Sequence, residues 1–266
     1  MTRLTEVLAA ARAENRAALV GYLPAGYPTA EGSAEAARAM VEGGCDVIEI
    51  GLPYSDPQMD GPVIQRAVEH ALANGVNTHH VIDNARAVAE TGAAALVMTY
   101  WNPVERYGVD RFAEELAAAG GAGVITPDLI PDEAADWIAA TDKHGLDRIF
   151  LVAPSSTDAR LKLTTDACGG FVYAASTMGI TGTRTSVGNR AAELVARTRK
   201  VTELPICVGL GVSNATQAAE IAAYADGVIV GSAFVRALLD APTPEAGMDA
   251  VRALAADLAE GVRAGR

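Results

Sequence analysis

Short apolar runs rich in valine and isoleucine alternate along the chain with longer stretches, rich in alanine, glutamate and arginine, that have the periodicity of a helix. Eight of the apolar runs have the length of a strand: Ala18 to Leu23, Val47 to Gly51, Ala95 to Thr99, Gly123 to Thr126, Arg148 to Val152, Gly170 to Tyr173, Pro205 to Val208 and Gly227 to Gly231. Strands that alternate with helices imply right-handed crossovers and a parallel sheet. Eight such units in 266 residues predict an α/β protein in which residues 1–266 form a single eight-stranded parallel (β/α)8 TIM barrel.

Residues typical of helix ends stand where this pattern needs them. Thr29 or Ser33 opens the helix after the first strand, and Pro131 starts a helix after the fourth. Thr243 and Pro244 have the order of an N-cap followed by proline at the first helical position. An open, doubly wound sheet is the alternative fold, because periodicity does not show closure. No GxGxxG follows the first strand, which argues against the dinucleotide-binding version of that sheet.

The first residues predict an extra N-terminal helix over Leu4 to Asn15. The segment from Val7 to Ala11 is apolar, but Arg12 and Glu14 interrupt it before the apolar region of a signal peptide can form. The longest apolar stretches are also well short of the ~18 residues that a membrane helix needs. We therefore expect a cytoplasmic protein that does not enter a membrane.

The charge balance limits the partners of the protein. The chain has 21 lysine and arginine residues against 33 acidic ones, a formal net charge of −12. This charge repels polyanions and no basic stripe offsets it, so nucleic acid and acidic membrane surfaces are poor partners. An anionic small-molecule substrate would need a local binding device. Cys45, Cys168 and Cys207 lack CxxC spacing, which is typical of small buried residues in a reducing compartment.

Glu49 is the first candidate catalytic residue. Side chains alternate along Val47 to Gly51, so Glu49 faces the same way as Val47 and away from Ile48 and Ile50. One face of a barrel strand packs on helices and the other on the barrel core, and a carboxylate on either face costs several kcal/mol unless it is paired or neutralised. A structural ion pair or an exposed strand tip would explain it. The functional alternative is a carboxyl in an apolar pocket, with a raised pKa, that gives and takes a proton.

Asp60 is the second candidate. It lies eleven residues after Glu49, in a long loop from Leu52 to Gly61 between a strand and a helix. Loops of this length are uncommon in that position unless they are functional. The other acid in the loop, Asp56, stands before a proline and is well placed for a turn.

Glycines after three neighbouring strands predict a phosphate site. Gly179-Ile180-Thr181-Gly182 follows the sixth strand, Gly209-Leu210-Gly211 the seventh and Gly231-Ser232 the eighth. Barrels often bind phosphate after strands seven and eight, where a helix N-terminus offers N–H donors and a partial positive charge. A single glycine cluster is more often only a turn, but three that converge indicate a binding site.

The positions of the other reactive side chains narrow the chemistry. The three lysines, Lys143, Lys162 and Lys200, fall in outer helical segments, so neither a Schiff base in the barrel mouth nor an attached pyridoxal phosphate is expected. The four histidines lie in helices or loops away from strand ends, and none has metal-ligand spacing with acids. We therefore expect no metal and no organic cofactor, and acid–base catalysis by carboxylates.

The same residues carry a resemblance to a known family. The stretch from Glu49 to Gln65, EIGLPYSDPQMDGPVIQ, closely resembles the signature of the tryptophan synthase α chain. The resemblance covers essentially the whole chain and continues through Tyr100 to Pro103, Pro127 to Leu129, Tyr173 with Gly179 to Gly182, and Gly209 to Ser213. Three positions differ from the usual family residue: Met59, Ile130 and Leu210.

The resemblance implies a lyase of tryptophan biosynthesis that splits indole-3-glycerol phosphate into indole and glyceraldehyde 3-phosphate by a retro-aldol cleavage. It makes Glu49 the acid–base carboxylate and puts Asp60 beside the ring N–H. The substrate-binding residues that it implies are Tyr22, Tyr100 and Tyr173 around the indole and glycerol, and Thr181, Gly182, Gly211, Gly231 and Ser232 on the phosphate. For the tyrosines taken alone, packing in the barrel core is an equal explanation.

The resemblance also implies a partner, the tryptophan synthase β chain, a pyridoxal phosphate enzyme, in an αββα heterotetramer. Contact is expected at the loop from Leu52 to Asp60 and at Asn102 and Pro103. Two other classes stay open: a stand-alone lyase that releases free indole, and a non-catalytic regulatory subunit of a β partner, against which the presence of both carboxylates argues. A barrel isomerase of phosphosugars is a weaker alternative.

Overall fold

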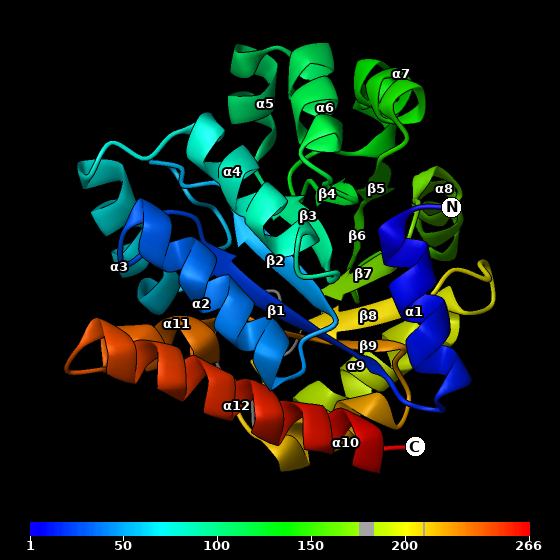
Figure 1. Ribbon diagram of the computed structural model, residues 1–266. Helices are drawn as coiled ribbons and strands as arrows, with labels where there is room; N and C mark the ends of the chain where they lie inside the picture. The colour runs from blue at the N-terminus through cyan, green and yellow to red at the C-terminus, as the bar shows by residue number, and fades with distance from the viewer. Residues whose placement is uncertain (176–183, 210) are drawn as a thin grey trace.

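The chain is described by a computed structural model for residues 1–175, 184–209 and 211–266 (Figure 1). Its strands form one parallel sheet. They are β1 (Ala18–Pro24), β2 (Val47–Gly51), β3 (Ala94–Met98), β4 (Gly123–Ile125), β5 (Asp147–Ile149), β6 (Leu151–Val152), β7 (Val172–Ala175), β8 (Ile206–Gly209) and β9 (Gly227–Val230). Seven of the predicted runs each match one strand. The fifth, Arg148 to Val152, matches both β5 and β6.

This division at Phe150 accounts for the nine strands of the described sheet where eight were expected. The strand order is β5-β4-β3-β2-β1-β9-β8-β7-β6, so β5 and β6 stand at its two ends although only Phe150 separates them. On one side Thr126 N donates to Ile149 O, and on the other Tyr173 N donates to Phe150 O, each at 3.3 Å. One continuous segment therefore joins both ends of the sheet. The barrel is closed, and the open-sheet alternative is excluded.

Helices surround this barrel (Figure 1). They are α1 (Arg3–Ala13), α2 (Ala30–Gly43), α3 (Pro62–Ala73), α4 (Thr78–Ala89), α5 (Trp101–Tyr107), α6 (Val109–Ala118), the 3₁₀ helix η1 (Pro131–Glu133), α7 (Ala135–His144), α8 (Asp158–Ala167), α9 (Arg184–Thr198), α10 (Ala215–Ala222), α11 (Ser232–Leu239) and α12 (Pro244–Ala264). No described helix is long and apolar enough to cross a membrane.

Helices begin at the three places that the sequence predicted. Thr29 caps α2 by accepting from Gly32 N, and Thr243 caps α12 by accepting from Ala246 N, with proline next to it. Ser33 is buried inside α2 instead. Pro131 starts a helix after the fourth strand, as predicted, but this helix is the three-residue η1, and the longer α7 begins separately at Ala135.

The core has two parts, one between sheet and helices and one inside the barrel. The inner part contains Val20, Val47, Leu96, Ile125 and Ile149, one from each of five neighbouring strands. The predicted N-terminal helix is α1, and its Leu4, Leu8 and Ala11 join this inner cluster. Helix α1 therefore covers the barrel where the strands begin, and the carboxyl ends of the strands form the other end, where barrel enzymes carry their sites.

Candidate active site

Glu49 faces the barrel interior near the carboxyl end of β2. Its register partners are Tyr22 on β1 and Leu96 on β3. The residue is only 1% exposed, its Oε1 has no hydrogen-bond partner, and no cation in the described part of the chain forms an ion pair with it. Burial raises its pKa from 4.5 to about 8. A structural ion pair within the described residues and an exposed strand tip are thus excluded, and Glu49 holds its proton at neutral pH.

Asp60 lies in the connection between β2 and α3. It is half-buried, and burial raises the pKa of its carboxyl above the ordinary value. Its carbonyl oxygen accepts a hydrogen bond from Gln65 Nε2 at 2.8 Å. Asp56, in the same loop, is exposed and accepts from the hydroxyl of Ser55 at 2.6 Å. The loop therefore directs one carboxylate toward the protein and leaves the other at the surface.

The three predicted tyrosines lie around these carboxyls. Burial, and then the charges of Asp60 and Glu49, raise the pKa of Tyr22 well above its ordinary value. Burial also raises the pKa of Tyr173 well above 10, with a contribution from Glu49, and raises that of Tyr100, with a contribution from Asp60. Each tyrosine is near enough to Glu49 or Asp60 for that charge to affect its pKa, so the five residues form one site. The phenols stay neutral there and can donate hydrogen bonds.

The described part of the glycine-rich rim adjoins this group. Gly211 lies after β8, is exposed and has a φ of 62°, and no described atom would crowd a Cβ added to it. Gly231 is the N-cap of α11 and Ser232 is its first residue, so the free N–H groups of that helix start here. A Cβ on Gly231 would lie 3.4 Å from Cδ1 of Tyr22. The rim after β9 is therefore next to the carboxyl site. Thr181, Gly182 and Leu210 lie outside the described residues.

Other reactive groups lie elsewhere. Lys143 and His144 both contact Asp110 at the outer surface, and Lys162 pairs with Asp166 on α8. This agrees with the prediction that the lysines lie in outer segments. No group of three or more histidine, cysteine or acidic side chains that could hold a metal ion occurs among the described residues.

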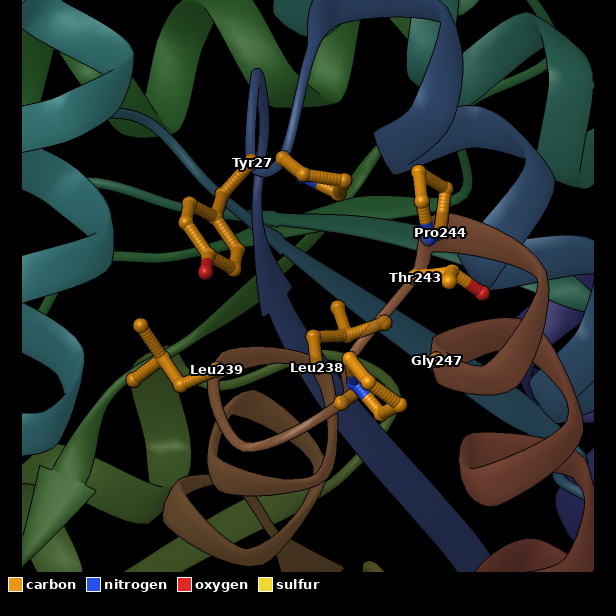
Figure 2. A pocket seen from close by; sticks show the side chains of 9 residues that line it. Tyr27, Leu238, Leu239, Thr243, Pro244 and Gly247 are labelled. Carbon is orange, nitrogen blue, oxygen red and sulfur yellow. The ribbon is translucent and has the colours of Figure 1, made fainter.

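A hollow of about 190 Å³ opens beside the loop after β1, between it and the connection of α11 to α12 (Figure 2). It is lined by Tyr27, Pro28, Leu238, Leu239, Ala241, Pro242, Thr243, Pro244 and Gly247. Figure 2 shows the Tyr27 ring on one side and Leu238 and Leu239 on another. None of the lining residues is charged or belongs to the predicted site. The hollow is therefore separate from the carboxyl site.

Sequence reasoning missed the contribution of Gln65 and of Tyr54. Gln65 holds the Asp60 carbonyl, and Tyr54 Oη accepts from Asn102 Nδ2 at 3.0 Å. Both residues were inside the quoted signature, but neither has a side chain that suggests chemistry. For Gln65 the only signal was its place in the first turn of α3, where a side chain can reach back to the preceding loop.

A closed parallel barrel with a neutral, unpaired carboxyl at the carboxyl end of a strand defines a class of barrel enzymes that work by acid–base catalysis. The family model described as "Tryptophan synthase alpha chain" matches residues 8–263. The chain belongs to this family, the α subunits of tryptophan synthase, lyases of tryptophan biosynthesis whose reaction is the cleavage of indole-3-glycerol phosphate and whose partner is a β chain.

Individual relatives agree over the whole chain. The tryptophan synthase alpha chain of Thermobifida fusca (strain YX) is 63% identical over 99% of each chain. That of Streptomyces coelicolor is 61% identical over 98% of this chain and 96% of the relative. Among solved structures, tryptophan synthase of Mycobacterium tuberculosis matches with a TM-score of 0.92 at 58% identity, over 98% of both chains. The alpha chain of Legionella pneumophila matches with a TM-score of 0.88 at 32% identity, over 98% of this chain and 97% of that one.

Proposed function

We propose that Glu49 and Asp60 carry out the retro-aldol cleavage of indole-3-glycerol phosphate in this chain, and that Tyr22, Tyr100 and Tyr173 surround the indole and glycerol. The observation that carries the proposal is the state of Glu49, which is buried without a charged partner in the described residues and has a pKa of about 8. An acid with that pKa holds its proton at neutral pH and can still release it. This is the property that a general acid–base group needs.

In the proposed mechanism Glu49 gives its proton to the indole ring carbon that bears the glycerol side chain. The ring becomes a cationic indolenine, and ionised Asp60 beside the ring N–H stabilises that positive charge. The carbon–carbon bond then breaks, and its electron pair returns to the ring to form indole. The hydroxyl on the departing carbon becomes the aldehyde of glyceraldehyde 3-phosphate as its proton passes to Glu49. The acid is thereby restored without a cofactor.

The phosphate is proposed to bind at Gly211, Gly231 and Ser232, with Thr181 and Gly182 completing the site from outside the described residues. Support comes from the N-terminus of α11 at Ser232, where unpaired N–H groups and the helix dipole attract an anion. Gly231 also lies against Tyr22, so one substrate can span from the phosphate site to the carboxyls. This local attraction offsets the repulsion that a net charge of −12 would cause for an anionic substrate.

The β chain is proposed to be a pyridoxal phosphate enzyme that receives indole in an αββα assembly, with residues 1–266 acting as one domain in the cytoplasm. Contact is proposed at the loop from Leu52 to Asp60 and at Asn102 and Pro103. These two segments are joined by the hydrogen bond from Asn102 to Tyr54. Met59, 48% exposed, and Ile130, 45% exposed, give this side of the molecule apolar surface that a partner could cover.

Indole release from indole-3-glycerol phosphate by the purified chain, with and without a β chain, tests the proposal. We expect release by the chain alone and faster turnover when the β chain is added. A stand-alone lyase would show no increase, and a regulatory subunit would release no indole. Cleavage or isomerisation of sugar phosphates that lack indole would favour the phosphosugar isomerase instead. The matched control is Glu49→Gln, which keeps the side-chain shape and removes the transferable proton.

A further inference from the structure

The backbone around Asp60 is held from two directions. On the amino side, the hydroxyl oxygen of Tyr100 accepts hydrogen bonds from the backbone N–H groups of Gln58, at 3.0 Å, and Met59, at 2.9 Å. On the carboxyl side, Gln65 donates from Nε2 to the carbonyl oxygen of Asp60 at 2.8 Å and from its backbone N to Gly61 O at 3.0 Å. The residue that carries the carboxylate therefore lies between two fixed points.

Both fixed points belong to rigid elements. Tyr100 lies two residues after β3 and is the N-cap of α5, it is buried at 6% exposure, and its ring packs at 5.6 Å on that of Tyr54. Gln65 lies in the first turn of α3. Asp60 itself lies in neither helix nor strand. The two side chains thus fix the loop around Asp60, which has no regular structure of its own, relative to the barrel and to α3.

The Tyr100 hydroxyl is not needed to give buried N–H groups a hydrogen-bond partner. Gln58 and Met59 are both exposed, so water can hydrogen-bond to their N–H groups if the phenol is removed. The free-energy cost to the fold is therefore small. What the phenol oxygen does add is a fixed place for two consecutive peptide groups immediately before Asp60.

We infer that Tyr100 and Gln65 are positioning residues, which act on the cleavage by holding Asp60 at the ring N–H of the substrate. The inference rests on the proposed role of Asp60. A carboxylate stabilises a developing cation only where that charge appears, and a displacement of about 1 Å can cost roughly 10²-fold in rate. Because the charge on the ring exists in the transition state and not in the bound substrate, a displaced Asp60 lowers kcat and leaves KM nearly unchanged.

Two variants each remove one of the two fixed points, the two hydrogen bonds to the Tyr100 oxygen or the single one from Gln65 Nε2. Tyr100→Phe keeps the ring and loses the acceptor, and Gln65→Met keeps the length and loses the donor. We expect each to lower kcat by about 10- to 10²-fold, with KM changed by less than about threefold. The matched control is Tyr107→Phe, which loses the hydrogen bond of its hydroxyl to Glu115 between α5 and α6 but leaves both contacts around Asp60, and its kcat should stay within about twofold of wild type.

A double-mutant cycle shows whether the effect passes through Asp60. If it does, Tyr100→Phe has no further effect on single-turnover cleavage by Asp60→Asn, because the group that it positions is already removed. Additive losses would show that the phenol acts on the substrate directly, and the positioning role would be wrong. Wild-type turnover by Asp60→Asn would be a different result: it would contradict the proposed function itself.

Amide hydrogen exchange supplies a readout that does not depend on activity. The N–H groups of Gln58 and Met59 should exchange faster in Tyr100→Phe and at the wild-type rate in Gln65→Met. Unchanged exchange in Tyr100→Phe together with unchanged kcat would overturn the inference. If Tyr100→Phe does not fold, the same cycle with Gln65→Met and Asp60→Asn decides it.

Discussion

Tyr22 on β1 and Glu49 on β2 are register partners, at the ends of two neighbouring parallel strands where the barrel opens. Partners in a parallel sheet point to the same side, so the phenol and the carboxyl both face the interior. The Tyr22 hydroxyl reaches past Glu49 to Gly51, where an added Cβ would lie 2.3 Å from its oxygen. Tyr22 therefore covers the strand beyond Glu49, and burial in this part of the barrel raises the pKa of the Glu49 carboxyl.

Replacement of Glu49 by glutamine tests the acid–base role. We expect Glu49→Gln to lower kcat by ~10²–10⁴-fold, the range for loss of a general acid–base group, with little change in KM. The amide has the shape of the protonated acid, so the fold should tolerate it. Steady-state kinetics of indole release measure both constants. Turnover at the wild-type rate would sink the assignment.

Unfolding free energy should depend on pH through Glu49. Its carboxyl has an ordinary pKa of 4.5 and a folded-state pKa of about 8. Below pH 4.5 both states hold the proton; between these values only the folded state does. The stability that the neutral carboxyl contributes is thus fully present below pH 4.5 and is lost as the pH rises through about 8.

The difference between Glu49→Gln and wild type isolates this effect, because other groups titrate alike in both proteins. In urea unfolding, the unfolding free energy of the variant minus that of wild type should rise by up to roughly 1.4 kcal/mol for each pH unit between the ordinary and the folded-state pKa of Glu49. Above the folded-state pKa this difference should level off. A difference that stays constant with pH would show that Glu49 titrates as an ordinary acid.

The pH profile of catalysis should have two limbs. The free enzyme needs Glu49 protonated, so kcat/KM should fall above about pH 8. It needs Asp60 ionised, and because burial raises the pKa of that carboxyl, the acid limb should lie above the ordinary aspartate value of 3.8. Initial rates at low substrate concentration measure the profile, and Asp60→Asn should lack the acid limb. A kcat/KM that rises through pH 8 would reverse the proposed proton transfer.

Gly51 should not tolerate a side chain. In Gly51→Ala the new Cβ would stand 2.3 Å from the Tyr22 hydroxyl and 2.7 Å from its ring, so the Tyr22 side chain must shift. We expect a loss of about 1–3 kcal/mol in unfolding free energy from overpacking, with a lower kcat/KM. Gly61→Ala is the control, because nothing lies within 4 Å of its Cβ, and its unfolding free energy should change by less than about 0.5 kcal/mol. Equal stability of the two variants would contradict the packing argument.

The other end of the barrel should affect stability alone. Asp46, immediately before β2, pairs with Arg16 through two hydrogen bonds of 2.7 and 2.8 Å and accepts from Leu19 N at 2.8 Å. Asp46→Ala removes both hydrogen bonds from the largely buried Arg16, which keeps its ion pair with the exposed Glu14, and should cost about 1.5–3 kcal/mol without lowering kcat. The exposed pair of Asp83 and Arg86 is the control, and Asp83→Ala should cost less than about 0.5 kcal/mol. Thermal and urea unfolding, with kcat per folded molecule, distinguish the two ends.

Periodicity and capping residues in the sequence predicted the alternation of strands and helices, and the closed barrel followed from their number. The alternation along Val47 to Gly51 also placed Glu49 on the same face as Val47, which the structure shows to be the interior. These features depend on neighbouring residues alone, because side-chain direction in a strand and N-capping in a helix are properties of the local backbone.

Only the tertiary structure decided which residues far apart in the chain meet. The predicted fifth strand is divided at Phe150 because the residues before it pair with β4 and the residues after it pair with β7. This pairing depends on strands at both ends of the sheet. Three other features depend on closure in the same way. They are the absence of a charged partner for Glu49 within the described residues, the contact of Tyr100 with the loop some forty residues before it, and the hydrogen bonds of Asp46 with Arg16. Local backbone preferences decide whether a segment forms a strand or a helix. The burial of a side chain and its hydrogen-bond partners depend on the distant segments that the fold places next to it.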